Sequence, residues 1–98
     1  MNEVNFRIWL SQNEKNKKVT SDSISRLKKL ERELDIIDID IEYNKDRCEY
    51  LLSLFENTGR NARMNKYKTE LPIGKYSLNT YKYALRLYCK FLEDVKES

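Results

Sequence analysis

SLNTYKYALRLYCKFLEDV, residues Ser77 to Val95, is the stretch that decides the fold. Its apolar side chains recur at helical spacing, because their offsets from Tyr81 are 3, 4, 7, 11 and 14. The residues at those offsets are Ala84, Leu85, Tyr88, Leu92 and Val95, with Cys89 and Phe91 beside them. They form one face of a long helix that Ser77 or Asn79 would cap. No other segment offers so long an apolar face, so we expect the earlier elements to pack on this helix.

Three shorter helices are predicted upstream of it. The first covers residues 2–12, the second covers residues 20–34 with Thr20 or Ser21 as its cap, and the third covers residues 45–56. Their apolar positions lie three or four residues apart, at Phe6, Trp9 and Leu10; at Ile24, Leu27, Leu30 and Leu34; and at Cys48, Leu51, Leu52 and Phe55. The candidate caps of the third helix are Asn44 and Asp46.

Residues 35–43 are ambiguous. Isoleucine and tyrosine alternate there with acidic residues, which is the period of a strand. The only candidate partner is residues 68–73, which contain Pro72, so we expect an extended connector and leave a short pairing, a helical turn and coil open. Residues 58–76 form a loop longer than is usual in a compact domain. We therefore predict an all-α fold, a four-helix or five-helix orthogonal bundle.

The composition is that of a small globular domain. The 98 residues make one domain, and the 40% hydrophobic share is too high for a disordered chain, despite 36% charged residues. No apolar run is long enough to span a membrane, and Met1-Asn2-Glu3 lacks the features of a secretion signal. We therefore expect a cytoplasmic protein in which Cys48 and Cys89 are buried thiols, although a disulfide between them stays open.

Positive charge is concentrated before the last helix. Residues 58–77 carry five basic side chains and one acidic side chain, a net of +4, whereas residues 1–57 have a net charge of −2. Guanidinium, ammonium and amide groups donate to phosphate oxygens, and Tyr67 and Tyr76 could stack or donate a hydroxyl. Helix N-termini add a partial positive charge. The candidate DNA-binding residues are Lys17, Lys18, Thr20, Ser21, Arg60, Arg63, Lys66, Lys68, Lys75, Asn79, Thr80 and Lys82.

Other chemistry has weaker support. The carboxylates of Asp35, Asp38, Asp40 and Glu42 could hold a hard cation, but a solvated edge opposite the isoleucines explains them better, and the turn glycine of a calcium loop is absent. The chain has no histidine, which excludes mixed Cys–His zinc sites and histidine general bases. It also lacks a glycine-rich phosphate loop. We therefore expect no catalytic, cofactor-binding or metal site, and no enzyme activity in these residues.

Three motifs together resemble a known family. They are Phe6-x-x-Trp9-Leu10, Thr20-Ser21-x-x-Ile24-x-x-Leu27 and Ser77-Leu78-Asn79-Thr80-x-x-x-Ala84-Leu85-x-x-Tyr88-x-x-Phe91-Leu92. Their order is similar to the SAM-like core-binding domain at the N-terminus of phage-integrase-type tyrosine recombinases, and to related N-terminal helical modules of bacterial restriction and mobile-element proteins. The resemblance implies a SAM-like bundle of four or five helices that clamps one side of a duplex, beside a separate C-terminal catalytic domain of the same parent chain. It also implies that the helix starts at Thr20–Ser21 and Asn79–Thr80 lie near the DNA backbone. Residues 35–43 and 58–76 depart from the spacing usual in the family.

We therefore expect a non-catalytic module that binds double-stranded DNA in recombination, integration or restriction. Phosphate contacts would supply most of the affinity, and base reading, by Asn79 or Asn61, would be limited. The alternative is a helical protein-interaction or dimerisation domain that does not bind nucleic acid. It is suggested by aromatic residues on more than one face of the last helix, at Tyr81, Tyr83, Tyr88 and Phe91. A metal-dependent nuclease built on the acidic connector is the third alternative, disfavoured because no lysine-bearing catalytic strand accompanies the acids.

Overall fold

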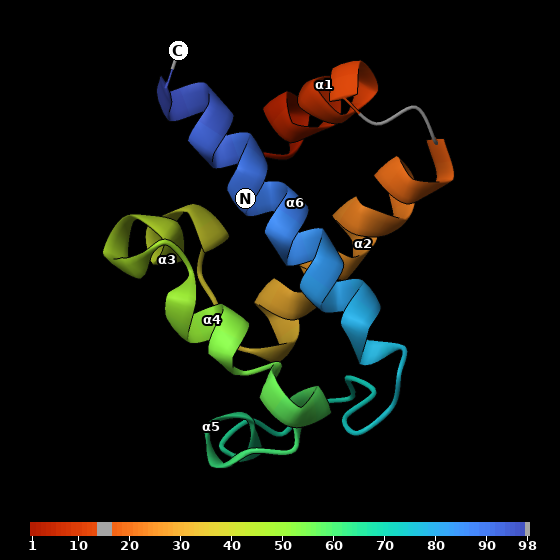
Figure 1. Cartoon of the computed structure of the whole chain (residues 1–98), viewed down its shortest axis with the longest axis vertical. Coiled ribbons are helices and arrows are strands. Elements are labelled where there is room, and N and C mark those ends of the chain that lie inside the picture. Colours follow the sequence, from red (N-terminus) through yellow and green to blue (C-terminus); the bar gives the residue numbers. More distant parts are fainter. Residues whose placement is uncertain (14–16, 98) are drawn as a thin grey trace.

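A computed structural model describes residues 1–13 and 17–97 of the chain, with side chains up to Val95. The elements in chain order are α1 (Glu3–Asn13), α2 (Lys17–Glu33), α3 (Ile39–Asp46), α4 (Glu49–Ser53), the 3₁₀ segment η1 (Glu56–Gly59), α5 (Ala62–Asn65) and α6 (Leu78–Glu97). No strand occurs among the described residues, so the predicted all-α fold is confirmed (Figure 1).

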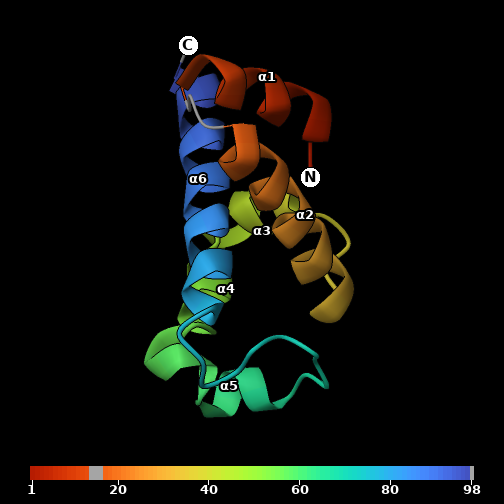
Figure 2. The ribbon, with the colours of Figure 1, turned by 90° about the vertical axis from the view of Figure 1, so that its right-hand side faces the viewer.

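The long helix α6 is the element on which the others pack. α2 crosses it, and α1 lies against both helices at one end of the molecule (Figures 1 and 2). Ala84, Leu85 and Tyr88 are at most 1% exposed, which confirms the predicted apolar face. Leu92 is still buried, but Val95 is half exposed, so the buried part of this face ends about one turn earlier than predicted.

The first two helices bury the residues that their spacing selects. Phe6 and Leu10 of α1 are fully buried. Trp9 is half-buried because its ring nitrogen lies near the surface, where it donates to Asp94 Oδ2 of α6 at 3.0 Å. The buried apolar side chains that α2 and the turn after it contribute are Ile24, Leu27, Leu30 and Leu34.

The predicted start of the second helix is wrong. α2 is already helical at Lys17, so Thr20 and Ser21 lie inside it and do not cap it. The physical reason is local. Lys17 and Lys18 are good helix formers, and Val19 is half-buried beside α6, so this turn gains packing as a helix.

Residues 35–43 do not form a strand. Asp38 has extended backbone (φ −160°, ψ 130°) and caps α3, since its carboxylate accepts a bond from a backbone amide of the first turn at 2.9 Å. Ile39 and Tyr43, four residues apart, face the core, whereas Ile37 is 92% exposed. The helical period replaces the period of two because the described residues offer no strand as a partner and the acidic side chain supplies a cap.

The predicted third helix is divided into α3 and α4. Arg47 and Cys48 both have left-handed backbone (φ 58° and 63°), which ends α3 and redirects the chain. Arg47 N donates to Tyr43 O at 2.7 Å, as in a left-handed helix C-cap. The predicted caps Asn44 and Asp46 therefore lie inside α3. The turn lets each short helix bury its own apolar side in the common core.

The segment before α6 contains a short helix, which a prediction of a plain loop missed. Asn61 caps α5, because its Oδ1 accepts from Met64 N at 2.9 Å. The Nδ2 of Asn61 donates to the carbonyls of Leu54 and Glu56 at 3.0 and 2.8 Å. Met64 and Leu71 are buried and anchor the segment to the core. Asn61 is thus held in structural hydrogen bonds and is not available to read a base.

The start of α3 also holds the N-terminal amine. The ammonium of Met1 contacts Asp38 Oδ1 and lies 3.0 Å from Glu31 Oε2, which also accepts from the amide of Ile39 at 3.1 Å. Burial opposes its charge, but the hydrogen bonds that the ammonium donates to the two carboxylates outweigh burial and raise the pKa of the amine. For Asp38, burial is likewise outweighed by its bonds to the amine and to a backbone amide, which lower its pKa. This cluster joins the chain start, α2 and α3.

We expect the cluster to stabilise the fold between about pH 4 and pH 8. The lowered pKa of Asp38 gives stability that is present above the unfolded value and is lost on acidification. The raised pKa of the amine gives stability that is present below its unfolded value and is lost as the pH rises through the folded value. Asp38→Asn keeps a capping oxygen and removes the charge, so it should cost about 1 kcal/mol near pH 6 and less at both extremes. Urea unfolding of both proteins at about pH 3, 6 and 10 measures this, and parallel pH profiles would contradict it.

Candidate nucleic-acid interface

A groove between α2 and the start of α6 brings polar and aromatic side chains together. Its volume is about 250 Å³. It is lined by Val19, Ser23 and Arg26 from α2, and by Tyr76, Asn79, Thr80 and Tyr83 from the start of α6 and the residues just before it. Asn79, Thr80 and Tyr83 lie in the first two turns of α6, and Tyr76 lies in the turn that precedes the helix. Tyr76 and Tyr83 are 86% and 52% exposed, so their rings are open to a ligand.

Two of the predicted DNA-binding residues line this groove. Asn79 is exposed, and its amide can donate to a phosphate or a base edge. The hydroxyl of Thr80 donates to Ser77 O at 2.6 Å, so only its oxygen lone pairs are available to a ligand. Lys75 is exposed just before the groove-lining residues, whereas Lys82 is half-buried and does not line the groove.

The backbone at the start of α6 does not offer free amides. The N–H groups of Leu78, Asn79 and Thr80 donate to the carbonyls three residues earlier, at 3.0, 3.0 and 3.1 Å. A phosphate would have to break these turns before it could bind the amides. These three amides already have partners, so side chains are the groups that can bind an anion here.

The candidate residues at the start of α2 lie apart from residues 58–77, which we call the basic segment. Lys17 and Lys18 are exposed in the first turn of α2, whereas α5 lies toward the other end of the molecule's longest dimension, 37 Å (Figures 1 and 2). Thr20 is half-buried and Ser21 is exposed, both inside the helix. The twelve predicted residues, all within the described chain, therefore do not form one continuous surface.

Part of the basic segment has structural partners. Arg63 Nη2 donates to Glu56 Oε2 at 2.5 Å and to a carbonyl of α4 at 3.2 Å, which neutralises its charge locally. The guanidinium of Arg60 lies over Gly74, where an added Cβ would meet it. The three lysines of this segment, Lys66, Lys68 and Lys75, are exposed.

The two tyrosines of the basic segment differ in role. Tyr67 is half-buried, and its hydroxyl lies 3.1 Å from the hydroxyl of Tyr50 on α4. That hydrogen bond and burial raise the pKa of Tyr67 to about 12. Tyr67 therefore fastens the segment to the core, and only Tyr76 remains as a stacking surface.

Four groove residues, Val19, Ser23, Arg26 and Tyr83, were not among the predicted DNA-binding residues, and Arg26 and Tyr83 are the two with long polar side chains. Arg26 lies on a face of α2 that reads as ordinary charged surface, in an i, i+4 pair with Asp22 at 3.9 Å. Tyr83 was assigned only to the aromatic content of the last helix. Tyr83 lies one turn after Asn79 on α6, but its meeting with Arg26 depends on how α2 crosses α6, which no local pattern specifies.

Three acidic residues of the connector, Asp38, Asp40 and Glu42, have partners within the fold. Asp40 accepts a hydrogen bond from the hydroxyl of Tyr88, and Glu42 pairs with Lys45 at 3.2 Å. Asp38 binds the N-terminal amine. Within residues 1–13 and 17–97, no three His, Cys, Asp or Glu side chains are grouped in a way that could hold a metal ion.

The two cysteines are buried free thiols. Cys48 precedes α4 and Cys89 lies on α6, and the thiol of Cys48 donates to Ile39 O at 3.9 Å. The neighbouring Cys89 thiol and burial raise the pKa of Cys48, so its thiolate is disfavoured. The thiol of Cys48 is therefore a packing group and not a nucleophile.

Comparisons with protein-family models, curated proteins and solved structures gave no match to this chain. None of the helices in the described part of the chain has the length and apolar character needed to cross a membrane.

Proposed function

We propose that the chain is a non-catalytic module that binds double-stranded DNA along the α2–α6 groove. The observation that carries the proposal is the meeting of Arg26, Asn79, Tyr76 and Tyr83 in one open groove. A guanidinium, an amide and two phenol hydroxyls are all donors to phosphate oxygens. The Arg26–Asp22 pair is loose and partly exposed, so Arg26 can turn to a phosphate at little cost.

Further cations extend this surface toward α5. Lys75 precedes the groove, and Lys66 and Lys68 are exposed in the same segment of net charge +4. Phosphate contacts of this kind give weak binding with little sequence preference, with a Kd on the order of 10⁻⁴–10⁻⁶ M at physiological salt. A role in DNA recombination, integration or restriction rests only on the sequence resemblance to core-binding domains.

We expect the affinity for a duplex to fall steeply with salt, because each neutralised phosphate releases counterions. Fluorescence anisotropy with a labelled duplex of about 20 base pairs, at about 50 and 200 mM salt, measures this. The double variant Arg26→Glu, Lys75→Glu should weaken binding about tenfold or more at the lower salt and flatten the salt dependence.

A matched control separates the groove from overall charge. Arg32→Glu reverses an exposed cation in the last turn of α2, away from the groove, and should change the affinity about twofold at most. Equal losses for Arg26→Glu alone and for Arg32→Glu would assign the binding to net charge and contradict the proposed surface. Absence of binding at 50 mM salt would reject DNA binding altogether.

A further inference from the structure

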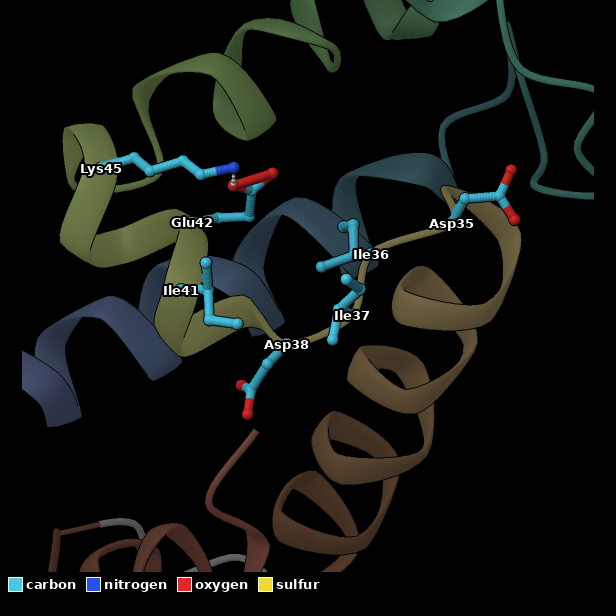
Figure 3. A pocket seen from close by; sticks show the side chains of 7 residues that line it. All are labelled: Asp35, Ile36, Ile37, Asp38, Ile41, Glu42 and Lys45. Carbon is cyan, nitrogen blue, oxygen red and sulfur yellow. Dashed lines mark ion pairs between the residues drawn. The ribbon is translucent and has the colours of Figure 1, made fainter.

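A small hollow beside the connector exposes aliphatic side chains. It has a volume of about 120 Å³ and lies between the end of α2 and the outer side of α3 (Figure 3). Ile36, Ile37 and Ile41 line it, and the side chain of Ile41 points toward Ile37 across the hollow. Ile37 is 92% exposed and Ile41 is 46% exposed. These two isoleucines are on the outside because Ile39 of the same segment faces the core.

Hydrogen bonds fix the connector on both sides of Ile37 and so keep the shape of the hollow. Ile36 N donates to Glu31 O at 2.9 Å, just after the left-handed residue Asp35 (φ 52°). At the other end, Asp38 caps α3 and binds the N-terminal amine. A ligand would therefore meet a preformed surface and would not have to order the connector first.

The rim of the hollow is acidic. The residues that line the hollow include three acidic side chains, Asp35, Asp38 and Glu42, and one basic side chain, Lys45, although the whole chain has a net charge of +3. Asp35 is exposed on the rim and Glu42 lines the hollow, where Lys45 pairs with it. This potential repels a nucleic-acid backbone and attracts a cationic partner.

We propose that this acidic, aliphatic hollow docks a basic peptide segment of another protein, with one leucine- or isoleucine-sized side chain seated between Ile37 and Ile41. The aliphatic side chain would cover the two exposed isoleucines. Neighbouring lysines or arginines would face Asp35 and would replace the exposed Lys45 as the partner of Glu42. This inference does not depend on DNA binding, because it uses a different surface of opposite charge.

A random peptide library displayed on phage provides the test. The library is selected on the 98-residue chain and counter-selected on the double variant Ile37→Ser, Ile41→Ser. Enriched peptides should combine leucine or isoleucine with lysine or arginine. Synthetic copies should bind the double variant about tenfold more weakly or worse. Replacing their basic residues by glutamate should abolish binding.

The matched control is Ile8→Ser, which removes an aliphatic side chain of similar exposure on α1 and should leave the affinity unchanged. Far-UV circular dichroism establishes that each variant keeps its helices. The proposal is overturned if no peptide is enriched, if enriched peptides are acidic or lack an aliphatic residue, or if they bind the double variant equally well. A dimer of the wild-type chain that Ile37→Ser dissociates would instead make a second copy the occupant and would also overturn it.

Discussion

Replacing Phe6 by alanine lowers the free energy of unfolding by about 3–5 kcal/mol. Phe6 is fully buried and fastens α1 to α6. Its ring centroid lies 4.9 Å from that of Tyr88, in an edge-on arrangement, and 5.5 Å from that of Phe91. Truncation removes these contacts and leaves a cavity between the two helices. A domain of this size is stable by only about 5–15 kcal/mol, so the loss is a large share of the total.

Urea unfolding followed by far-UV circular dichroism measures the Phe6→Ala effect. Ile8→Ala, in the same helix, removes a side chain that is 52% exposed and should stay within about 0.5 kcal/mol of the wild type. A loss below about 1 kcal/mol for Phe6→Ala would show that α1 contributes little to the folded state in solution.

Gly59→Ala is expected to cost about 2–4 kcal/mol. Gly59 is buried under the start of α6, with φ +81°, a conformation that costs a residue with a Cβ about 1–2 kcal/mol. An added Cβ would also lie 2.8 Å from Leu78 Cδ2 and 3.0 Å from Ile73 Cδ1. Leu78 is buried and cannot move freely, so overpacking adds to the backbone strain.

Gly74→Ala is the matched control for Gly59→Ala. Gly74 has nearly the same backbone angle, φ +77°, but the three atoms nearest to its added Cβ all belong to the guanidinium of the exposed Arg60. The Arg60 side chain can move into solvent. The expected loss in free energy of unfolding is therefore only the cost of the positive φ, about 1–2 kcal/mol. The difference between the two variants in the free energy of unfolding, measured with urea, gives the cost of the close contacts that a Cβ at Gly59 would make with Leu78 and Ile73. Equal losses would contradict the packing argument.

The two proposed surfaces lie apart and differ in charge. The first half of α2, which lines the groove, and α3, which borders the acidic hollow, lie on opposite sides of α6 (Figure 1). A molecule built in this way could bind a polyanion on one side while it docks a cationic segment on the other. The Arg26 and Ile37 variants test these two activities separately, since each changes a side chain of one surface only.

Local spacing was sufficient to predict the long helices. The face of α6 from Ala84 to Leu92, and the buried residues Phe6 and Leu27, follow directly from a period of 3.6. This works because α1, α2 and α6 are long enough for one apolar face to outweigh local alternatives. The spacing of apolar residues did not predict the elements between residues 35 and 76. The elements there are short, and a few apolar residues fit the period of a helix as well as that of a strand.

Side-chain donors of the candidate interface could be listed from the sequence, but their grouping could not. The sequence supplied Asn79, Thr80 and Lys75, and it also supplied Arg63 and Asn61, which the fold uses for its own hydrogen bonds. Composition shows which groups could bind phosphate. It does not show which of them already have a partner, because the partners are distant in the chain or belong to the backbone.

The sequence by itself determined that this protein is all-helical, that α6 is its central element and that positive charge gathers before that helix. Only the tertiary structure decided that Arg26 meets Tyr76 and Tyr83, that Asp38 binds the N-terminal amine and that Ile37 stays exposed. The physical reason is the range of the interactions. A helical face is a repeat between neighbours along the chain, whereas a groove, an ion pair with the chain start and an uncovered isoleucine depend on how whole helices cross.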